Sequence, residues 1–310
     1  MLNSSQAIKP VWQTPFRPFF LLGALFSCLV LVLWVAQLSG FVQLNTYGPA
    51  LSWHAHEMLF GFTMAIVVGF LLTAVRNWTG HKSAQGPALK MLVLLWCLSR
   101  LLWLFSDSPA WLVALCDGAL PLYAGYWMAK PLLELESKLG SKSGQKHNWW
   151  FVVVLLALGV SQFIYHGVMA YRPQLLSTLH YSLVLVMSNL VFWIGGRVLP
   201  FFVQSKLQMP RRVIPIWLTP AAMTSSWSLI VLMLLQDIMP EQLLPSVAII
   251  ASVLHGYRLS LYFRKGVIKD SMLWSLFIAP CWIILGLLAL AFDSLNWLHL
   301  ITVGGLGGMI

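Results

Sequence analysis

The stretch Trp53-His54-Ala55-His56-Glu57-Met58 opens an apolar run, Leu59 to Val75, that can cross a lipid bilayer. It places two imidazoles and one carboxylate at membrane depth. Ionisable groups there are unfavourable unless they bind a ligand, pair with one another or carry protons. The stretch therefore predicts a membrane-spanning helix with a functional site near its start.

The composition excludes an ordinary soluble domain. Hydrophobic residues make up 59% of the chain and charged residues only 9%, whereas a soluble domain carries about 25% charged residues. Lipid must cover most of such a surface. The formal net charge of +10 comes from basic residues between apolar segments, a pattern typical of membrane topology. We expect the lipid bilayer, and no nucleic acid, as the partner of this surface.

The apolar segments predict an all-α, polytopic transmembrane helix bundle. A spanning helix needs roughly 20 mainly apolar residues, and nine segments qualify as full spans. A tenth begins near Trp297 and stops at Ile310, about half-way across, which predicts a chain truncated at its C-terminus. We expect residues 1–310 to form a single integral membrane domain. The nine segments are approximately 19–38, 53–75, 88–106, 110–129, 149–170, 174–196, 213–235, 243–263 and 272–291.

The loops between these segments alternate in charge. Those on the side of the N-terminus carry the basic residues, and those on the other side carry most of the acidic ones. Because Lys and Arg collect on the cytoplasmic side of membrane proteins, we expect a multi-pass inner-membrane protein with a cytoplasmic N-terminus. Examples are Lys9, Arg76, Lys130, Arg197 and Arg264 on one side, and Asp107, Asp237 and Glu241 on the other.

Several kinds of chemistry lack their sequence signals. The four cysteines fall inside predicted helices without a C-x-x-C or C-x-x-C-H spacing, so we expect neither a thiolate zinc site nor covalently attached haem. No nucleotide-binding or serine-hydrolase motif is present.

The predicted topology places five of the eight histidines in the outer third of the membrane. Imidazole is a ligand for haem iron, copper and zinc, and a b-type haem needs one or two histidines from separate helices. The alternative is that each histidine is a polar packing residue bonded to a neighbouring helix, which we favour for His166 and for the deeper His255. The five are His54, His56, His166, His180 and His299.

Helical spacing limits what the first histidine pair can do. His54 and His56 lie about 200° apart on a helix and cannot face one small ion together. Glu57 and Met58 share a face with His54, and Met58 is a soft candidate ligand for copper. The two histidines either belong to different sites or His54 lies before the helix begins.

Two further charges lie at matching depth. Arg100 is about six residues from the outer end of its segment, and Asp117 is about seven residues into the next one. A buried ion pair is the favoured interpretation. The alternative assigns Arg100 to a haem propionate or an anionic substrate.

These motifs resemble the NnrS family of bacterial inner-membrane proteins, and the resemblance covers essentially the whole chain. The stretch from Trp53 to Phe62 is its strongest single piece. The other motifs are Phe16-Arg17-Pro18-Phe19-Phe20, Gly69-Phe70-Leu71-Leu72-Thr73-Ala74-Val75, Asn77-Trp78-Thr79-Gly80, Gly196-Arg197-Val198-Leu199-Pro200-Phe201-Phe202 and the segment from His299 to Ile310.

The resemblance implies about twelve spanning helices in the full-length protein, non-covalent haem b, copper, and a role in denitrification or relief of nitrosative stress. It places His54, His56 and His299 among the metal residues, and the depth of His180 adds that residue. Arg100, Glu57 and Met58 complete the set as candidate cofactor-binding residues.

Three functions remain open from the sequence. The first is a haem and copper protein that binds or removes nitric oxide or its iron adducts, with or without catalysis and with an unknown electron donor. The second is a proton-coupled secondary transporter in which the histidines and Glu57 relay protons. The third is a membrane sensor of nitric oxide without catalysis.

Overall fold

The computed structural model of the chain describes residues 8–139, 144, 146–210, 212–292 and 296–309, and within these ranges every regular element is a helix. The contacts divide the chain into two compact units, Met1–Leu176 and Ser177–Ile310. We refer to them as the first unit and the second unit. The predicted all-helical class is confirmed.

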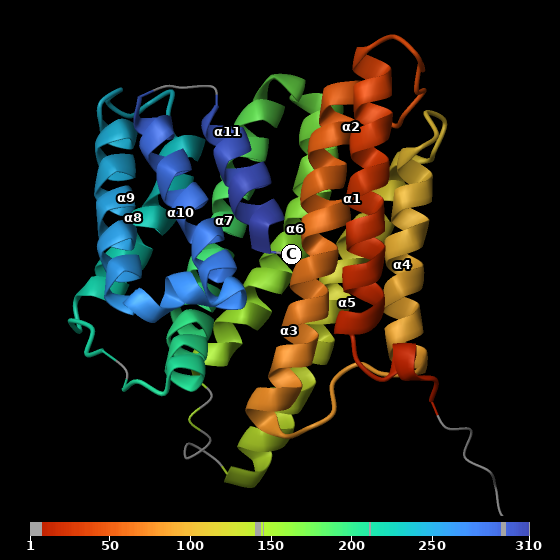
Figure 1. Ribbon diagram of the computed structural model, residues 1–310. Coiled ribbons are helices and arrows are strands. Elements are labelled where there is room, and N and C mark those ends of the chain that lie inside the picture. The colour runs from red at the N-terminus through yellow and green to blue at the C-terminus, as the bar shows by residue number, and fades with distance from the viewer. Residues whose placement is uncertain (1–7, 140–143, 145, 211, 293–295, 310) are drawn as a thin grey trace, which may run out of the picture. The chain divides into compact units, whose positions relative to one another are not determined.

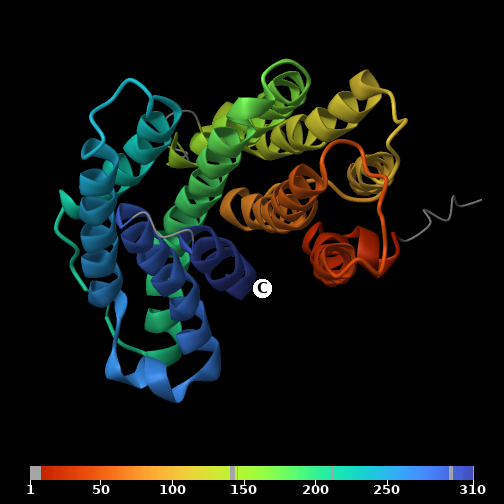
Figure 2. The same cartoon turned by 90° about the horizontal axis from the view of Figure 1, so that it is seen from above.

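The described residues of the first unit form six α-helices, a π-helical segment and short 3-10 helices. Its core forms where α5 packs against α3, α4 and α6, while α1 lies along α3, as Figures 1 and 2 show for the red, orange and yellow helices. The helices are α1 (Phe16–Leu38), α2 (Ala50–His56), α3 (Met64–Thr79), α4 (Pro87–Trp103), α5 (Ala110–Leu139) and α6 (Trp149–Tyr171), and the π-helical segment η2 is Glu57–Thr63.

The stretch from Trp53 to Met58 lies in one continuous helix, because α2, η2 and α3 follow one another without a break. A π-helical segment inside an α-helix is rare and is often found at a functional site. This continuous helix ends at Gly80, whose φ of 70° is the left-handed cap that glycine adopts without strain. Its π segment packs against α1 and α4, and six of the seven residues of that segment are buried.

The second unit packs α9 between α8 and α10 and places the C-terminal π-helical segment against α10. An apolar cluster joins the ends of three helices: Leu199 and Val203 of α7, Tyr262 of α9 and Phe277 of α10. The elements are α7 (Leu176–Leu207), α8 (Leu218–Leu234), α9 (Leu243–Tyr262), α10 (Ser271–Ala291), α11 (Trp297–His299) and the π-helical segment η7 (Leu300–Leu306).

Seven helices of the described residues are long and apolar enough to cross a membrane. α4 and α8 have 17 residues each, and α11 with η7 forms a shorter apolar helix, so the predicted count of nine full spans and a partial tenth is not confirmed. Leu21, Leu25 and Val32 of α1 are 60% or more exposed. An outer face of exposed leucine and valine is what lipid contact requires.

The seven spans are 16–38, 50–79, 110–139, 146–171, 173–207, 243–262 and 271–291. α5 and α7 continue about ten residues past their predicted ends at 129 and 196. These extra turns contain polar and basic residues, which is why hydropathy does not predict them as part of a membrane span.

Candidate functional site

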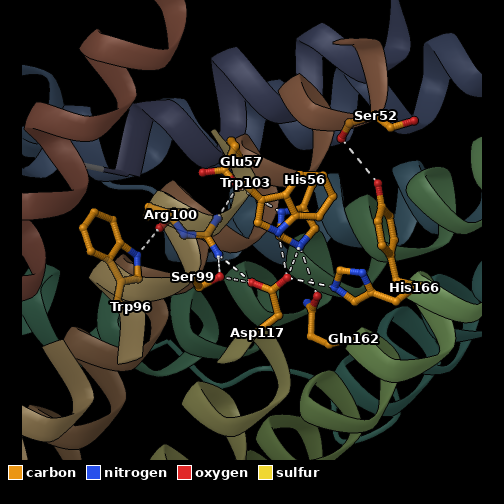
Figure 3. Close-up of polar contacts among 12 residues, drawn as sticks. Ser52, His56, Glu57, Trp96, Ser99, Arg100, Trp103, Asp117, Gln162 and His166 are labelled. Carbon is orange, nitrogen blue, oxygen red and sulfur yellow. Dashed lines mark hydrogen bonds and ion pairs between the residues drawn. The ribbon is translucent and has the colours of Figure 1, made fainter. Parts of the chain in front are cut away.

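A cluster of charged and polar side chains is buried inside the first unit, where α2, η2, α4, α5 and α6 meet (Figure 3). Every member is at most 6% exposed. Residues three or four apart share a helix face, which is how α4 presents three members to the cluster and α6 presents two. We call these residues the polar cluster: His56, Glu57, Ser99, Arg100, Trp103, Asp117, Gln162 and His166.

Asp117 is the centre of the polar cluster. Its Oδ1 accepts hydrogen bonds from the Ser99 hydroxyl and from Arg100 Nη2, the latter at 2.8 Å. Its Oδ2 accepts from Trp103 Nε1 at 2.8 Å and lies 2.9 Å from His166 Nε2. A buried carboxylate is tolerated only when donors or cations satisfy its oxygens in this way.

Arg100 joins the two carboxylates of the polar cluster. Its Nη1 donates to Glu57 Oε1 at 2.5 Å, and its Nη2 donates to Asp117. The predicted ion pair between Arg100 and Asp117 is therefore present, with Glu57 as a second partner. Gly61 provides the room, because a Cβ there would lie 3.1 Å from Arg100 Nη1 and 2.3 Å from a ring carbon of Phe26.

His56 is fully buried and is fixed on both sides. Its Nδ1 lies 3.1 Å from Glu57 Oε1, and its Nε2 lies 3.1 Å from Gln162 Oε1 and 3.4 Å from Asp117 Oδ2. The ring stacks on Trp103 with centroids 4.0 Å apart. A carboxylate bonded to one ring nitrogen of a histidine orients the ring and leaves the other nitrogen to act as a ligand.

Three side chains of the polar cluster form a possible metal-binding set. One ligand atom each from His56, Asp117 and His166 lies within 4.8 Å of the other two. Metal–nitrogen and metal–oxygen bonds of about 2.0–2.2 Å place neighbouring ligand atoms about 3–4 Å apart. The 2.9 Å and 3.4 Å separations from Asp117 Oδ2 to the two imidazole nitrogens are near this range.

The formal charges of the polar cluster do not balance when both histidines are neutral. Glu57 and Asp117 are two carboxylates, and within the part of the chain that the structure describes, Arg100 is the one permanent cation that pairs with them. An uncompensated charge is strongly unfavourable in a buried site. The cluster therefore favours an additional cation, which a bound metal ion or a proton on an imidazole provides.

Tyr47 covers the polar cluster from the loop that precedes α2. Its ring contacts Trp103 edge-on, with centroids 5.2 Å apart, and lies 5.8 Å from the His166 ring. Burial and the negative charge of Asp117 raise the pKa of the Tyr47 phenol. Tyr47 therefore remains a neutral group beside the cluster at physiological pH.

The remaining candidate residues from the sequence, His54, Met58, His180 and His299, are not members of the polar cluster as defined above. α2 begins at Ala50, so the alternative that His54 lies before the start of the helix is wrong. His54 is half-buried in the first unit, where its ring stacks on Trp34 with centroids 4.5 Å apart. Met58 is half-buried in η2. In the second unit, His180 of α7 is half-buried and His299 of α11 is exposed.

Two members of the metal-binding set, Asp117 and His166, are not predicted as metal ligands from the sequence. Asp117 was expected as an ion-pair partner and His166 as a packing residue. Their predicted depth in the membrane could have indicated that they lie together. The sequence places His56, Arg100, Asp117 and His166 near the outer ends of their segments. Gln162, four residues before His166, shares its helix face and points to the same site.

The fold and the site together define an all-helical protein of membrane-spanning character with a buried histidine and carboxylate cluster. The sequence model of the NnrS family, described as NnrS protein, matches residues 10–310. The chain therefore belongs to the NnrS family. No curated protein and no solved structure matches it.

Proposed function

We propose that this chain is a haem- and copper-binding protein of the bacterial inner membrane that binds or removes nitric oxide or its iron adducts during nitrosative stress. Membership of the NnrS family supports the process, and the polar cluster supports a metal site. Nitric oxide is small and neutral, so it can reach a buried site through lipid without a charged entry path.

The observation that carries the proposal is the contact between His56 and Asp117. If the neutral His56 ring carries its proton on Nδ1 and donates it to Glu57, its Nε2 has a lone pair. Nε2 lies 3.4 Å from Asp117 Oδ2, which is also an acceptor. Two acceptors at this distance are unfavourable unless a cation lies between them or the ring carries a second proton. The second imidazole, His166, completes a set that suits a metal ion.

Copper is the proposed ion because imidazole nitrogens bind it more tightly than other divalent first-row metals. Two imidazoles and one carboxylate also suit zinc or iron, so the metal content must be measured rather than assumed. When bound, copper supplies a redox-active centre. The residues of this chain bind it, orient it and exclude water.

Haem does not fit at His56. The Nε2 of this fully buried ring is enclosed by Gln162 and Asp117, and one ring face is covered by Trp103. We assign haem b instead to His180, which is half-buried, and to His299, which is exposed. Tyr181 and Trp297 make an edge-on contact with centroids 5.4 Å apart, so α7 and α11 pack together within a few residues of both histidines.

The first experiment measures metal content and the absorption spectrum of detergent-purified protein. We expect copper and a Soret band that shifts with nitric oxide. His56→Ala, His166→Ala and Asp117→Asn should lose copper, whereas His147→Ala, at an exposed position, should keep it. Wild-type protein that stays metal-free and spectrally silent after incubation with haem and copper would refute the proposal.

A second experiment separates the two cofactors. We expect His180→Ala and His299→Ala to lose or shift the Soret band while their copper content is unchanged. Loss of copper in these variants, with haem retained, would reverse the assignment.

A proton-coupled transporter is the second candidate, and one observation favours it. A proton on His56 would also relieve its contact with Asp117, and the ring lies between two carboxylates. In that case purified protein would remain free of metal. Reconstituted vesicles would take up solute when a proton gradient is imposed, and His56→Gln would abolish this uptake.

A further inference from the structure

Arg258 is a buried guanidinium in the second unit without an acidic partner. It is 4% exposed and lies four residues before the end of α9. Its Nη2 donates to the carbonyl oxygen of Phe192, while its Nη1 has no hydrogen-bond partner. Across the described residues, no carboxylate pairs with it. A buried cation in this state favours binding of an anion.

The surroundings of Arg258 form a narrow cavity. His255, one turn earlier on α9, lines the same cavity, and its Nδ1 is a second buried polar atom without a partner. Gly196 of α7 makes room for the guanidinium, because a Cβ there would lie 2.9 Å from Arg258 Nη2. The Arg258 guanidinium is therefore the donor with free N–H groups in this cavity.

A second cavity, of about 180 Å³, lies beside the first. The two share Gly196 and Tyr262 in their walls. Arg212 and Arg264 line the larger one, at the end of the unit where α7 and α9 stop. Asp270, the nearby acid after α9, pairs with Lys206 at 3.3 Å, and no carboxylate is among the residues of either cavity wall.

We propose that the larger cavity binds a phosphate group between Arg212 and Arg264, with the Arg258 guanidinium behind the wall residues Gly196 and Tyr262 that the two cavities share. The planar fork of a guanidinium matches the oxygens of a phosphate in two parallel hydrogen bonds. Arg258 lies about 6 Å from its helix end at 1.5 Å per residue, a depth that suits the headgroup of an anionic phospholipid. Free phosphate offers the same chemistry. This site is independent of the metal proposed for the first unit.

The test compares ligands that carry a phosphate group with a lipid that lacks one. Delipidated wild-type protein is titrated with phosphatidylglycerol, with diacylglycerol of the same chains and with inorganic phosphate, and binding is followed by native mass spectrometry and thermal shift. We expect one phosphatidylglycerol per chain and no specific binding of diacylglycerol. Binding of inorganic phosphate at the same residues would identify a free anion as the source.

Four variants locate the site. Arg212→Gln and Arg264→Gln are expected to weaken binding by about fivefold each, the effect of removing one basic contact to an anionic headgroup. Gly196→Ala should weaken it without changing any charge, because the added methyl group displaces the guanidinium. Lys265→Gln is the matched control: it removes an exposed charge from the same loop without lining either cavity.

Arg258→Gln should weaken binding, because it removes a positive charge next to the cavity, whereas Arg258→Lys, which keeps the charge, should fold and retain binding. The proposal is overturned if phosphatidylglycerol and inorganic phosphate bind no better than diacylglycerol. It is also overturned if the Arg212, Arg264 and Gly196 variants bind as tightly as the Lys265 control.

Discussion

Asp117 is the residue on which the polar cluster depends most, because it contacts Arg100, Trp103 and both histidines at once. Asp117→Asn keeps the shape of the side chain but removes its charge. Breaking a buried ion pair leaves the remaining cation uncompensated and costs about 3–5 kcal/mol. We expect that loss in the free energy of unfolding, measured in detergent.

The control for this prediction is Asp107→Asn. Asp107 is exposed and accepts a 3.4 Å hydrogen bond from Ser106, so its replacement should leave stability unchanged. If Asp117→Asn were as stable as the control, the polar cluster would not hold the first unit together.

At the scale of the element, the π-helical segment η2 depends on close packing at Gly61. Its carbonyl accepts from Trp96 Nε1 at 2.8 Å, and an added Cβ would lie 2.3 Å from the Phe26 ring of α1. We expect Gly61→Ala to destabilise the protein by about 1–3 kcal/mol through overpacking and to disturb Arg100 beside it. Thermal denaturation in detergent measures the loss.

Gly167→Ala is the matched control, because an added Cβ at this position of α6 meets nothing within 4 Å. Alanine is the better helix former by about 0.8–1 kcal/mol, so this variant should gain stability. Equal losses at both positions would show that packing against Phe26 is not what requires glycine at 61.

The start of α10 is set by a titratable cap. Asp270 accepts a hydrogen bond from the Leu273 amide at 3.0 Å and pairs with Lys206. These contacts hold the pKa of Asp270 below its ordinary value of 3.8, the amide bond being the main cause. Because the folded pKa is depressed, the stabilisation is present above pH 3.8 and is lost as the pH falls through the folded pKa.

Hydrogen exchange measures this effect. Amides in the first turn of α10 should exchange faster in Asp270→Ala than in the wild type at pH 6, and the difference should shrink as the pH falls below about 3.8. If the exchange rates of the two proteins still differed in strong acid, the ionised carboxylate of Asp270 would not be the group that caps α10.

At the scale of the whole molecule, charge bias predicts how the chain crosses the membrane. Lys146 and Arg172 are exposed on either side of α6, whose 23 residues span roughly 34 Å. In a chain without its four native cysteines, an impermeant maleimide should label Arg172→Cys in spheroplasts but not Lys146→Cys. Labelling of Lys146→Cys instead would invert the proposed topology.

Much of the fold could be predicted from hydropathy, since an apolar run longer than about 18 residues leaves few alternatives to a spanning helix. Helix ends were less predictable, because α5 and α7 continue through polar residues that packing or water can accommodate. The division into two units follows from contacts between helices, which hydropathy does not encode.

The site could be predicted in part. His56, Glu57 and Arg100 were identified as candidates from their position in apolar segments, and the polar cluster contains all three. The grouping of His56 with Asp117 and His166 could not be derived, because it depends on how α2, α5 and α6 are rotated about their axes. Spacing within one helix fixes relative directions only inside that helix.

The most direct test of the account is the electron paramagnetic resonance spectrum of protein loaded with one equivalent of Cu(II). If His56, Asp117 and His166 hold the ion, the spectrum will show coupling to two imidazole nitrogens, and His166→Gln will reduce it to one. A spectrum of unbound copper, or nitrogen coupling that is unchanged in both His56→Gln and His166→Gln, would contradict the assignment of the metal to this cluster.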